Sequence, residues 1–351
     1  MRSSLPRTKQ LYLPRTCRTN LNNAAGVFVA LQSTVRLKTV LTRVRSKDEM
    51  TRASVAIASI GRETLLDTLR SVAAVRLPEE MVLDVLIADD SSDGDATKLV
   101  AAHPIKNLQV TCLTVASGNI STARNALIDA AEGDWLIFVD DDEWVEPNWL
   151  EKLFLCQKEF EADVVIGPVH PVYPDGTPAW LQEANPLYSD WGSRGKRLYT
   201  GRGGNTLVRV DLIRSLQLRF DEAYGRTGGE DTIFFGQAAE RGARIFATDD
   251  AIAREHVPSD RLSVNYILSR AVRSGQSYGQ MRLTRHPDPV WHIFFALAAL
   301  TKCAAAGLLA VGLRIFNRPR SFRMRQKLAL NTGKLRAVLS LPLAELYKKT
   351  E

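Results

Sequence analysis

The chain has 351 residues, 45% of them hydrophobic, which is enough for one large domain or two small ones with a real core. Its net charge of +7 comes from the ends: residues 1–50 and 314–351 each carry 10 Lys and Arg against 2 Asp and Glu, whereas residues 51–313 carry 26 against 35. A nucleic-acid-binding fold would carry its basic patch on the body, so this distribution argues against nucleic acid as a partner. Basic ends favour an anionic membrane surface instead.

Residues 1–50 are expected to be a disordered basic extension. The apolar stretch Ala24–Leu31 is too short to span a membrane and has no clear small-residue cleavage site, so we do not expect a secretory signal. The composition fits an organelle transit peptide. Alternatively, Met50 is the natural start, because the first predicted strand begins a few residues later. A chain that begins at Met50 is expected to keep full activity.

Between residues 51 and 260, short apolar runs alternate with amphipathic helical patterns. This alternation predicts an α/β fold with a doubly wound, mostly parallel sheet and right-handed connections. The predicted strands are 54–59, 82–88, 108–115, 135–139, 164–169 and 245–248. The predicted helices are 62–75, a short one after Gly94, 121–131 capped by Ser121, one from after Pro147 to about residue 162, and 230–241. Residues 170–200, rich in Pro, Gly, Tyr and Trp, are expected to form a mobile substrate loop.

Residues 261–351 are predicted to form a helical, membrane-associating extension that starts with a helix over 261–277. The segment Val290–Leu313 is long and apolar, and a helix needs about 20 such residues to cross a bilayer. However, Lys302 lies near its middle, where a charge costs about 2.5–3.5 kcal/mol. Three interpretations stay open: a membrane span, a helix at the membrane interface or in a dimer, and a core helix. The basic cluster after it, over 314–327, suits either anionic lipid head groups or a solvated helix face.

Two clusters of carboxylates directly follow predicted strands, Asp89-Asp90 and Asp140-Asp141-Asp142. Open α/β sheets bind their ligands at the carboxyl ends of strands. The alternation of side chains past a strand places Asp140 and Asp142 on one side, where two carboxylates suit Mg²⁺ or Mn²⁺ carrying a phosphorylated substrate. A solvated acidic loop is the alternative. The pattern favours an enzyme.

These motifs occur in the order and spacing of family 2 glycosyltransferases, which the chain resembles over roughly residues 53–260. The resemblance rests on residues 54–62, 87–94, 123–125 with Gly133-Asp134, 138–142 and Gly229-Glu230-Asp231. A later part, Glu255-His256-Val257-Pro258 with Arg261 and residues 270–275, resembles the bacterial succinoglycan-type exopolysaccharide glucosyltransferases of this family. The resemblance implies the GT-A fold.

It also implies roles for individual residues. Asp231 matches the catalytic base and Glu230 a group that orients the acceptor, although acidic residues here also suit a helix N-terminus. Gly204 and Asn205 resemble the loop beside the donor sugar. The implied metal ligands are Asp142, Asp140 and, from the end of the last strand, His256; a locally hydrogen-bonded histidine is equally compatible.

The residues with an implied nucleotide-binding role are Ser59, Arg62, Asp89, Asp90, Arg124 and Asp141. Asp90 matches the carboxylate that accepts the N3–H of uracil, with Asp89 packed beside it, and Asp141 lies near the ribose. Arg124 offers a guanidinium fork suited to phosphate. Family members usually carry an aromatic side chain after the first strand, and Ser59-Ile60-Gly61-Arg62 lacks one, which leaves base stacking and uridine specificity open.

The resemblance therefore implies an inverting, metal-dependent glycosyltransferase, using Mg²⁺ or Mn²⁺ and a nucleotide sugar, most simply a UDP-sugar. Its expected acceptor is a saccharide, most simply lipid-linked, at the cytoplasmic face of a bacterial inner membrane, in exopolysaccharide or other cell-surface glycan synthesis. Two alternatives stay open. A sugar nucleotidyltransferase should carry a longer Gly-rich basic loop after the first strand than Ser59–Arg62. A non-catalytic membrane scaffold would not need Asp142 and Asp231.

Overall fold

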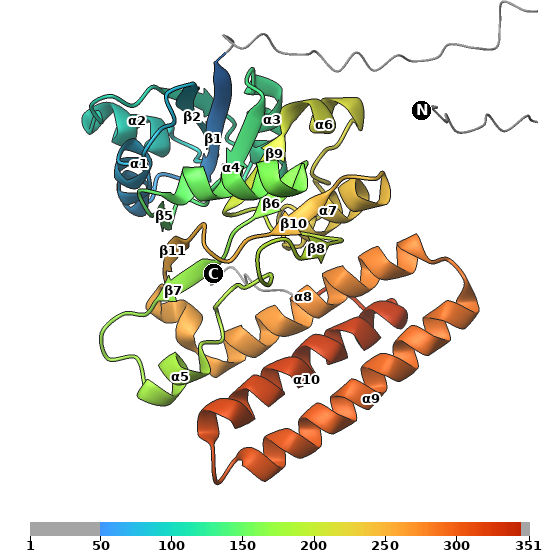
Figure 1. Cartoon of the computed structure of the whole chain (residues 1–351). Helices are drawn as coiled ribbons and strands as arrows, with labels where there is room; N and C mark the ends of the chain where they lie inside the picture. Colours follow the sequence, from blue (N-terminus) through green and yellow to red (C-terminus); the bar gives the residue numbers. More distant parts are fainter. Residues whose placement is uncertain (1–49, 345–351) are drawn as a thin grey trace, which may run out of the picture. The chain divides into compact units, whose positions relative to one another are not determined.

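The central sheet of the protein has the strand order β3-β2-β1-β4-β9-β6-β10-β8 (Figure 1). The computed structural model describes residues 50–344, so the expectations for residues 1–49 and 345–351 lie outside the described residues. The strands are β1 (Thr51–Ser59), β2 (Met81–Asp89), β3 (Val110–Thr114), β4 (Trp135–Phe138), β6 (Val164–Ile166), β8 (Arg197–Leu198), β9 (Thr206–Arg209) and β10 (Ile245–Ala247). β9 runs antiparallel to β4 and β6, and β8 runs antiparallel to β10, whereas the other neighbours are parallel. The predicted mostly parallel sheet is confirmed.

Helices cover both faces of this sheet, which explains why its strands read as continuous apolar runs. On one face, α1 (Thr64–Ala73) and α4 (Trp149–Phe160) pack on Val55 and Ile57 of β1. On the other face, α3 (Ile120–Ala130) and α7 (Glu230–Glu240) pack with Ala56, the alternate residue of the same strand. The doubly wound arrangement expected of a GT-A glycosyltransferase is therefore present. The remaining helices of the body are α2 (Asp95–Ala102) and α6 (Val210–Ser215).

A second, three-stranded sheet lies next to the site and was not predicted. It has the order β5-β11-β7, with β5 (Glu143–Val145), β7 (Val169–Val172) and β11 (Ala253–His256). The strand predicted over 164–169 is divided between β6 and β7, which belong to different sheets and are separated by Gly167 and Pro168. A Cβ atom on Gly167 would lie 2.5 Å from the Ala251 carbonyl oxygen. A second correction concerns α3, which is capped by Asn119 and not by Ser121: the Asn119 side chain accepts hydrogen bonds from the amides of Ser121 and Thr122.

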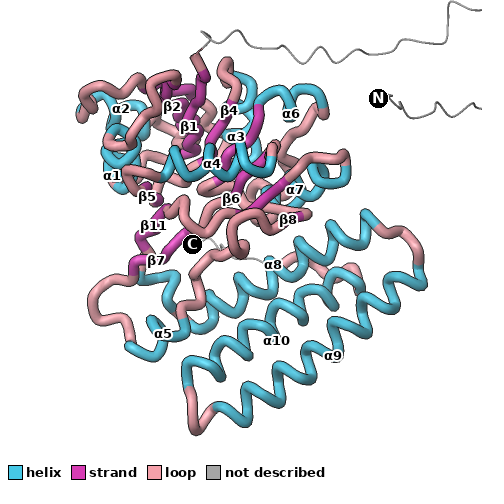
Figure 2. Tube along the Cα trace, in the orientation of Figure 1, coloured by secondary structure: helices cyan, strands magenta, loops and turns pink. Residues whose placement is uncertain are grey.

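The C-terminal helices form a layer in which α10 (Arg318–Val338) packs against both α8 (Val264–Arg285) and α9 (Pro289–Leu313) (Figure 2). α8 begins after its cap Ser263 and ends eight residues beyond the predicted Ser277. Gly275 and Gly333 let α8 and α10 approach closely, because a Cβ atom on either would lie about 2 Å from a carbonyl oxygen of the other helix. The helical extension therefore packs tightly on itself through α10.

The region expected to be a loop, 170–200, contains the short helix α5 (Ala179–Ala184) as well as β8. Leu181 and Ala184 of α5 are buried against Ile267 of α8 and Phe322 of α10. This segment thus connects the body to the helical layer. Its mobility stays a prediction.

Candidate active site

A cavity of about 990 Å³ opens at the carboxyl ends of β1 and β4 and extends to α7, α8 and α10. Ten of the thirteen residues with predicted site roles line it: Ser59, Arg62, Asp90, Arg124, Asp140, Asp141, Asp142, Gly204, Glu230 and Asp231. The structure therefore brings the aspartate triplet and the Glu230-Asp231 pair, about 90 residues apart in sequence, to the same cavity. Three predicted residues, Asp89, Asn205 and His256, do not line it.

Each aspartate of the triplet faces arginine side chains from distant parts of the chain. Asp141 accepts hydrogen bonds from the Ser59 hydroxyl at 2.7 Å and from Arg62 at 3.1 Å. Asp142 lies 3.5 Å from Arg62 and 3.6 Å from Arg261. The third, Asp140, lies 3.1 Å from Arg124 and 3.5 Å from Arg202. The acidic-loop alternative is wrong, because Asp141 and Asp142 are buried.

Burial and neighbouring charges separate the pKa values of these aspartates. Burial, together with the charges of Glu255, Asp140 and Asp141, raises the pKa of Asp142 to about 7. Burial also raises the pKa of Asp141, against the effect of Arg62. Burial opposes the ionisation of Asp140 as well, but the guanidinium groups of Arg124 and Arg202 outweigh it and lower the pKa of that carboxyl. Of the three aspartates, Asp142 is therefore the one whose negative charge is least compensated by its surroundings.

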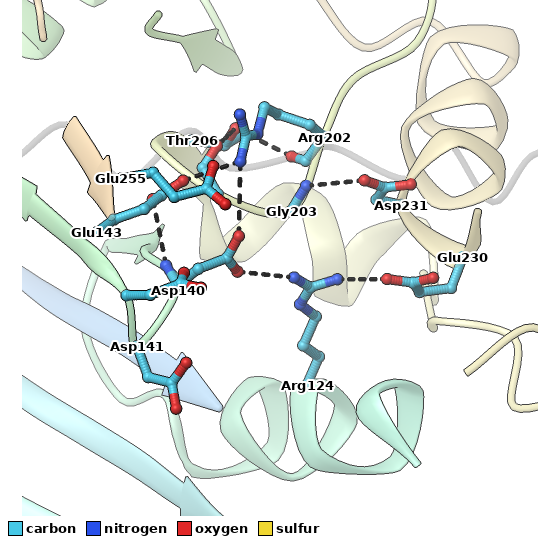
Figure 3. A network of polar contacts seen from close by, with 12 residues as sticks. Arg124, Asp140, Asp141, Glu143, Arg202, Gly203, Thr206, Glu230, Asp231 and Glu255 are labelled. Carbon is cyan, nitrogen blue, oxygen red and sulfur yellow. Dashed lines mark hydrogen bonds and ion pairs between the residues drawn. The ribbon is translucent and has the colours of Figure 1, made fainter. Parts of the chain in front are cut away.

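Arg124 of α3 joins the two halves of the site (Figure 3). It donates a hydrogen bond of 2.6 Å to Glu230 and one of 3.1 Å to Asp140. Its guanidinium lies against Gly203, where a Cβ atom would come within 2.3 Å of it. A glycine is required here because no larger residue leaves room for this bridge. Despite Arg124, burial and the charge of Asp231 raise the pKa of Glu230 to about 7.

Asp231 lies in the first turn of α7 and faces the cavity. One oxygen of its carboxylate accepts a hydrogen bond of 3.2 Å from the amide of Gly203, and the other accepts from the amide of its neighbour Thr232. The helix cap is Gly229, with a φ of +92°, and no side chain caps this end. The N-cap position itself belongs to Gly229, but Glu230 and Asp231 both lie in the first turn, where acidic side chains suit the helix N-terminus. A carboxylate that lines a cavity can act as a base.

Four charged residues around the aspartate triplet received no site role from the sequence, namely Glu143, Arg202, Glu255 and Arg261, although Glu255 and Arg261 belong to a motif quoted above. Arg202 donates a hydrogen bond of 2.8 Å to the fully buried Glu143 and lies 3.5 Å from Asp140 (Figure 3). Pairing of β5 with β11 sets Glu255 opposite Glu143, and Arg261 lies 3.3 Å from Glu255. Burial raises the pKa of Glu143 well above its usual range. A possible signal was Glu143 itself, an acid that continues the aspartate triplet into a strand.

The three predicted residues outside the cavity have structural roles. Asp89 is fully buried and accepts hydrogen bonds from Ser91 and Thr97, which fixes the start of α2. The side chain of Asn205 is also fully buried, accepts from Trp149 Nε1 at 2.7 Å and donates to the carbonyls of Pro168 and Ala251. We therefore no longer assign nucleotide contact to Asp89 or donor-sugar contact to Asn205.

His256 follows Glu255 in β11 and points the other way, because side chains alternate along a strand. Its ring lies 4.2 Å from that of Trp144 and borders a separate pocket next to α1. The assignment of His256 as a metal ligand is corrected accordingly. Among residues 50–344, no group of three His, Cys, Asp or Glu side chains is arranged as a metal site.

Asp90 borders the cavity, and its carboxylate accepts hydrogen bonds from the loop after β3. Its Oδ1 accepts hydrogen bonds from the amides of Ser117 and Gly118 and from the Ser117 hydroxyl, and its Oδ2 accepts one of 2.8 Å from the amide of Asn119. Oδ2 therefore keeps a lone pair for one further donor. This is the oxygen that suits a ligand N–H.

A doubly wound sheet with aspartates and arginines gathered around a cavity at its carboxyl edge defines an α/β protein whose charged cavity lies where such sheets bind their ligands. The sequence model described as "Glycosyl transferase family 2" matches residues 54–217. The succinoglycan biosynthesis protein ExoM of Rhizobium meliloti (strain 1021) is 31% identical over 312 residues, which is 87% of this chain and 98% of ExoM. The chain belongs to glycosyltransferase family 2.

Other relatives cover less of the chain. The poly(ribitol-phosphate) beta-N-acetylglucosaminyltransferase TarS of Staphylococcus aureus (strain MW2) is 26% identical over 204 residues, or 57% of this chain and 35% of TarS. A crystal structure of S. aureus TarS 1–349 in complex with UDP-GlcNAc is 15% identical, with a TM-score of 0.49, and covers 83% of this chain and 93% of that one.

Proposed function

We propose that this protein is an inverting glycosyltransferase that moves a hexosyl group from a nucleotide diphosphate sugar, most simply a UDP-sugar, to a saccharide acceptor. The observation that carries the proposal is that Asp231 and the aspartate triplet line one cavity, joined through Glu230, Arg124 and Asp140. A base and a diphosphate site that share a cavity are what a single displacement at an anomeric carbon requires.

In this mechanism Asp231 removes the proton of the acceptor hydroxyl while that oxygen attacks the anomeric carbon and the nucleoside diphosphate leaves from the opposite face. The amide of Gly203 holds the Asp231 carboxylate in place. Arg62 borders the cavity with almost half of its side chain exposed, so it can turn from Asp141 toward a phosphate. The free lone pair of Asp90 Oδ2 would accept the N3–H of a uracil.

The residues present fit a divalent cation, although their carboxylates are paired with arginines. Of the three aspartates, Asp142 carries the least compensated negative charge. Hard oxygen ligands such as Asp142 and Asp140 are those that Mg²⁺ and Mn²⁺ prefer. When bound, such a cation would neutralise charge on the leaving diphosphate, the role that a protonated carboxyl has in a glycosidase.

The biological setting that we infer is exopolysaccharide or other cell-surface glycan synthesis at the cytoplasmic face of a bacterial inner membrane, with a lipid-linked acceptor. The match to ExoM, which extends over 98% of a succinoglycan biosynthesis protein, supports this setting. So does α9, whose mean hydropathy and length would allow it to cross a membrane. Only 17% of the residues in its most apolar stretch are buried, which favours the membrane interpretations over a core helix.

The packing of α9 favours a helix that lies in the membrane interface over one that spans the bilayer. Ala299, Cys303, Ala306 and Ala310 are its buried residues and form the face that lets α10 pack alongside. α10 exposes Arg320, Arg323, Arg325 and Lys327. A spanning α9 would draw these cations into the hydrocarbon, at about 2.5–3.5 kcal/mol each. Lying flat, α9 can immerse its apolar face while α10 keeps its charges near anionic head groups.

The test is a panel of nucleotide sugars assayed with Mn²⁺ or Mg²⁺ for released nucleoside diphosphate, with the unaltered protein and two variants. Asp231→Asn should lower turnover at least 10³-fold, on the order expected when a general base is removed, and leave UDP affinity unchanged. Asp93→Asn, an exposed carboxylate outside the cavity, is the matched control and should be normal. Normal turnover of Asp231→Asn, or no metal-dependent UDP binding by the unaltered protein, would overturn the proposal.

A further inference from the structure

A second, smaller cavity of about 290 Å³ adjoins the active-site cavity on the side of α8 and α10. The two cavities share five lining residues: Tyr188, Ser189, Arg270, Ser274 and Leu330. They are therefore neighbouring compartments with a common wall. The hydrogen bond of 2.7 Å that Gln326 donates to the carbonyl of Pro186 ties α10 to the segment that closes the smaller cavity.

The lining of the side cavity is cationic, whereas acidic and basic residues balance in the lining of the main one. Eight carboxylates line the main cavity, together with eight Arg and Lys residues; the acids are Asp90, Asp140, Asp141, Asp142, Asp190, Glu230, Asp231 and Glu255. Among the described residues, those lining the side cavity include two cations, Arg270 and Lys327, and no acid. The remaining lining is largely apolar and includes Leu187, Ile267 and Leu330. Such a surface attracts an anion attached to an apolar group.

Two arginines that line the main cavity, Arg226 and Arg270, pair with no other described residue; Arg226 is exposed, whereas Arg270 is half-buried. Arg62, Arg124 and Arg202 are paired with carboxylates, and Arg273 donates hydrogen bonds to Thr227 and Gly228. Arg270 is half-buried and, within residues 50–344, makes no hydrogen bond or ion pair. A partly desolvated guanidinium with all its donors free is a site for a planar or tetrahedral oxyanion.

The volume of the side cavity and its position beside the main cavity indicate what kind of group it can hold. Pockets for whole drug-sized ligands measure about 300–1,000 Å³, so the main cavity suits a nucleotide sugar and the side cavity suits a smaller group. Arg270, Ser274 and Tyr278 are spaced four residues apart, and they form a wall of α8 that leads along the main cavity. Lys334 lies over the Tyr278 ring at 5.3 Å and continues this wall on α10.

We propose that the side cavity binds a phosphate ester of the acceptor, held by Arg270 and Lys327, while the acceptor sugar reaches Asp231 in the main cavity. The inference rests on the proposed function and adds to it the chemical class of the acceptor. No bond forms or breaks at this second site. Its apolar lining fits a phosphate that is carried on a lipid, and a phosphate on a soluble saccharide shares the same recognition by the two cations.

The experiment measures binding of farnesyl monophosphate and of inorganic phosphate at saturating UDP and Mg²⁺, so that the donor site is occupied. Arg270→Gln and Lys327→Gln should each weaken farnesyl monophosphate binding about tenfold, because each removes a charge-assisted contact. Lys158→Gln is the matched control, since Lys158 is an exposed cation in the last turn of α4 and lines neither cavity. Lys327 is exposed, so its variant tests the site without disturbing the fold.

Two results would overturn the inference. One is binding of farnesyl monophosphate by Arg270→Gln and Lys327→Gln that equals the control. The other is a loss of UDP affinity in Arg270→Gln as large as the loss for farnesyl monophosphate, which would assign Arg270 to the donor. Preference for farnesyl monophosphate over inorganic phosphate supports a lipid-borne phosphate, and equal binding of the two supports a soluble one. Failure of the unaltered protein to bind UDP would instead overturn the proposed function.

Discussion

Arg124 donates a hydrogen bond of 2.6 Å to Glu230, and both side chains are 8% exposed. This pair links the helix behind the aspartate triplet to the first turn of α7, which carries Asp231. It does not fully compensate Glu230, because Glu230 Oε2 is buried without a hydrogen-bond partner among the described residues. A buried carboxyl that is half satisfied resists ionisation, in agreement with its raised pKa.

The first prediction follows from that pKa, which lies near 7 in the folded protein against about 4.3 for an unfolded glutamate. The folded state binds the Glu230 proton more tightly than the unfolded state does. The stabilisation that this proton gives the folded state is therefore full below pH about 4.3 and is lost as the pH rises through about 7. Glu230→Gln should remove this contribution. Urea unfolding at pH 5 and pH 8 should show a smaller loss of stability for Glu230→Gln than for the unaltered protein. Glu240→Gln, exposed at the end of the same helix, is the control, and a slope equal to that control would contradict the prediction.

The second prediction concerns Asp142, the aspartate of the triplet with the least compensated charge. Replacing it with asparagine keeps the shape and removes the charge that attracts a cation. Asp142→Asn should weaken Mn²⁺-promoted UDP binding by at least about tenfold, because loss of a ligand to a hard cation removes a charged contact. Calorimetric titration of UDP with and without Mn²⁺ separates this effect from the metal-free affinity, which should stay unchanged. An unaltered Mn²⁺ titration would remove Asp142 from the role of ligand.

Sequence alone was sufficient for six strands of the central sheet, though not for β8 and β9, because strands covered on both faces must be apolar throughout. It also indicated that carboxylates after these strands meet at one edge, and ten of the thirteen predicted site residues do line one cavity. Sequence reasoning failed where a shift of one residue along a strand decides which face of the sheet a side chain points to. Glu255 points into the cavity and His256 away from it, and no local pattern shows which of the two does so. Glu143 was missed because its relation to Glu255 depends on the pairing of β5 with β11, more than 100 residues apart.

The third prediction addresses Arg273, a positioning residue on α8. The residue is 2% exposed, and its guanidinium donates to the carbonyls of Thr227 and Gly228, directly before the turn that presents Asp231. Lysine cannot reproduce this fork. Arg273→Lys should therefore lower kcat by about 10–100-fold through misplacement of Asp231, with the donor KM unchanged.

A purely structural role for Arg273 would lower the melting temperature and leave the kcat of the folded fraction intact. Melting curves and steady-state kinetics on the same sample distinguish the two cases. Arg282→Lys, on the same helix and outside the cavity, controls for the loss of a guanidinium from α8.

The last prediction concerns Ile315 and Phe316, which are 87% and 86% exposed in the turn between α9 and α10. Exposed side chains of this size next to Arg314 and Arg318 suit insertion into an anionic interface. Burying one large apolar side chain contributes about 1.5–3 kcal/mol, so Phe316→Asp should weaken binding to phosphatidylglycerol vesicles by at least about tenfold in sedimentation assays. Leu155→Asp, an exposed apolar residue of α4, should bind normally. Equal binding of both variants would contradict an interfacial α9, as would self-association through α9 in sedimentation equilibrium or resistance of the bound protein to alkaline extraction, because these results indicate a dimer interface and a membrane span respectively.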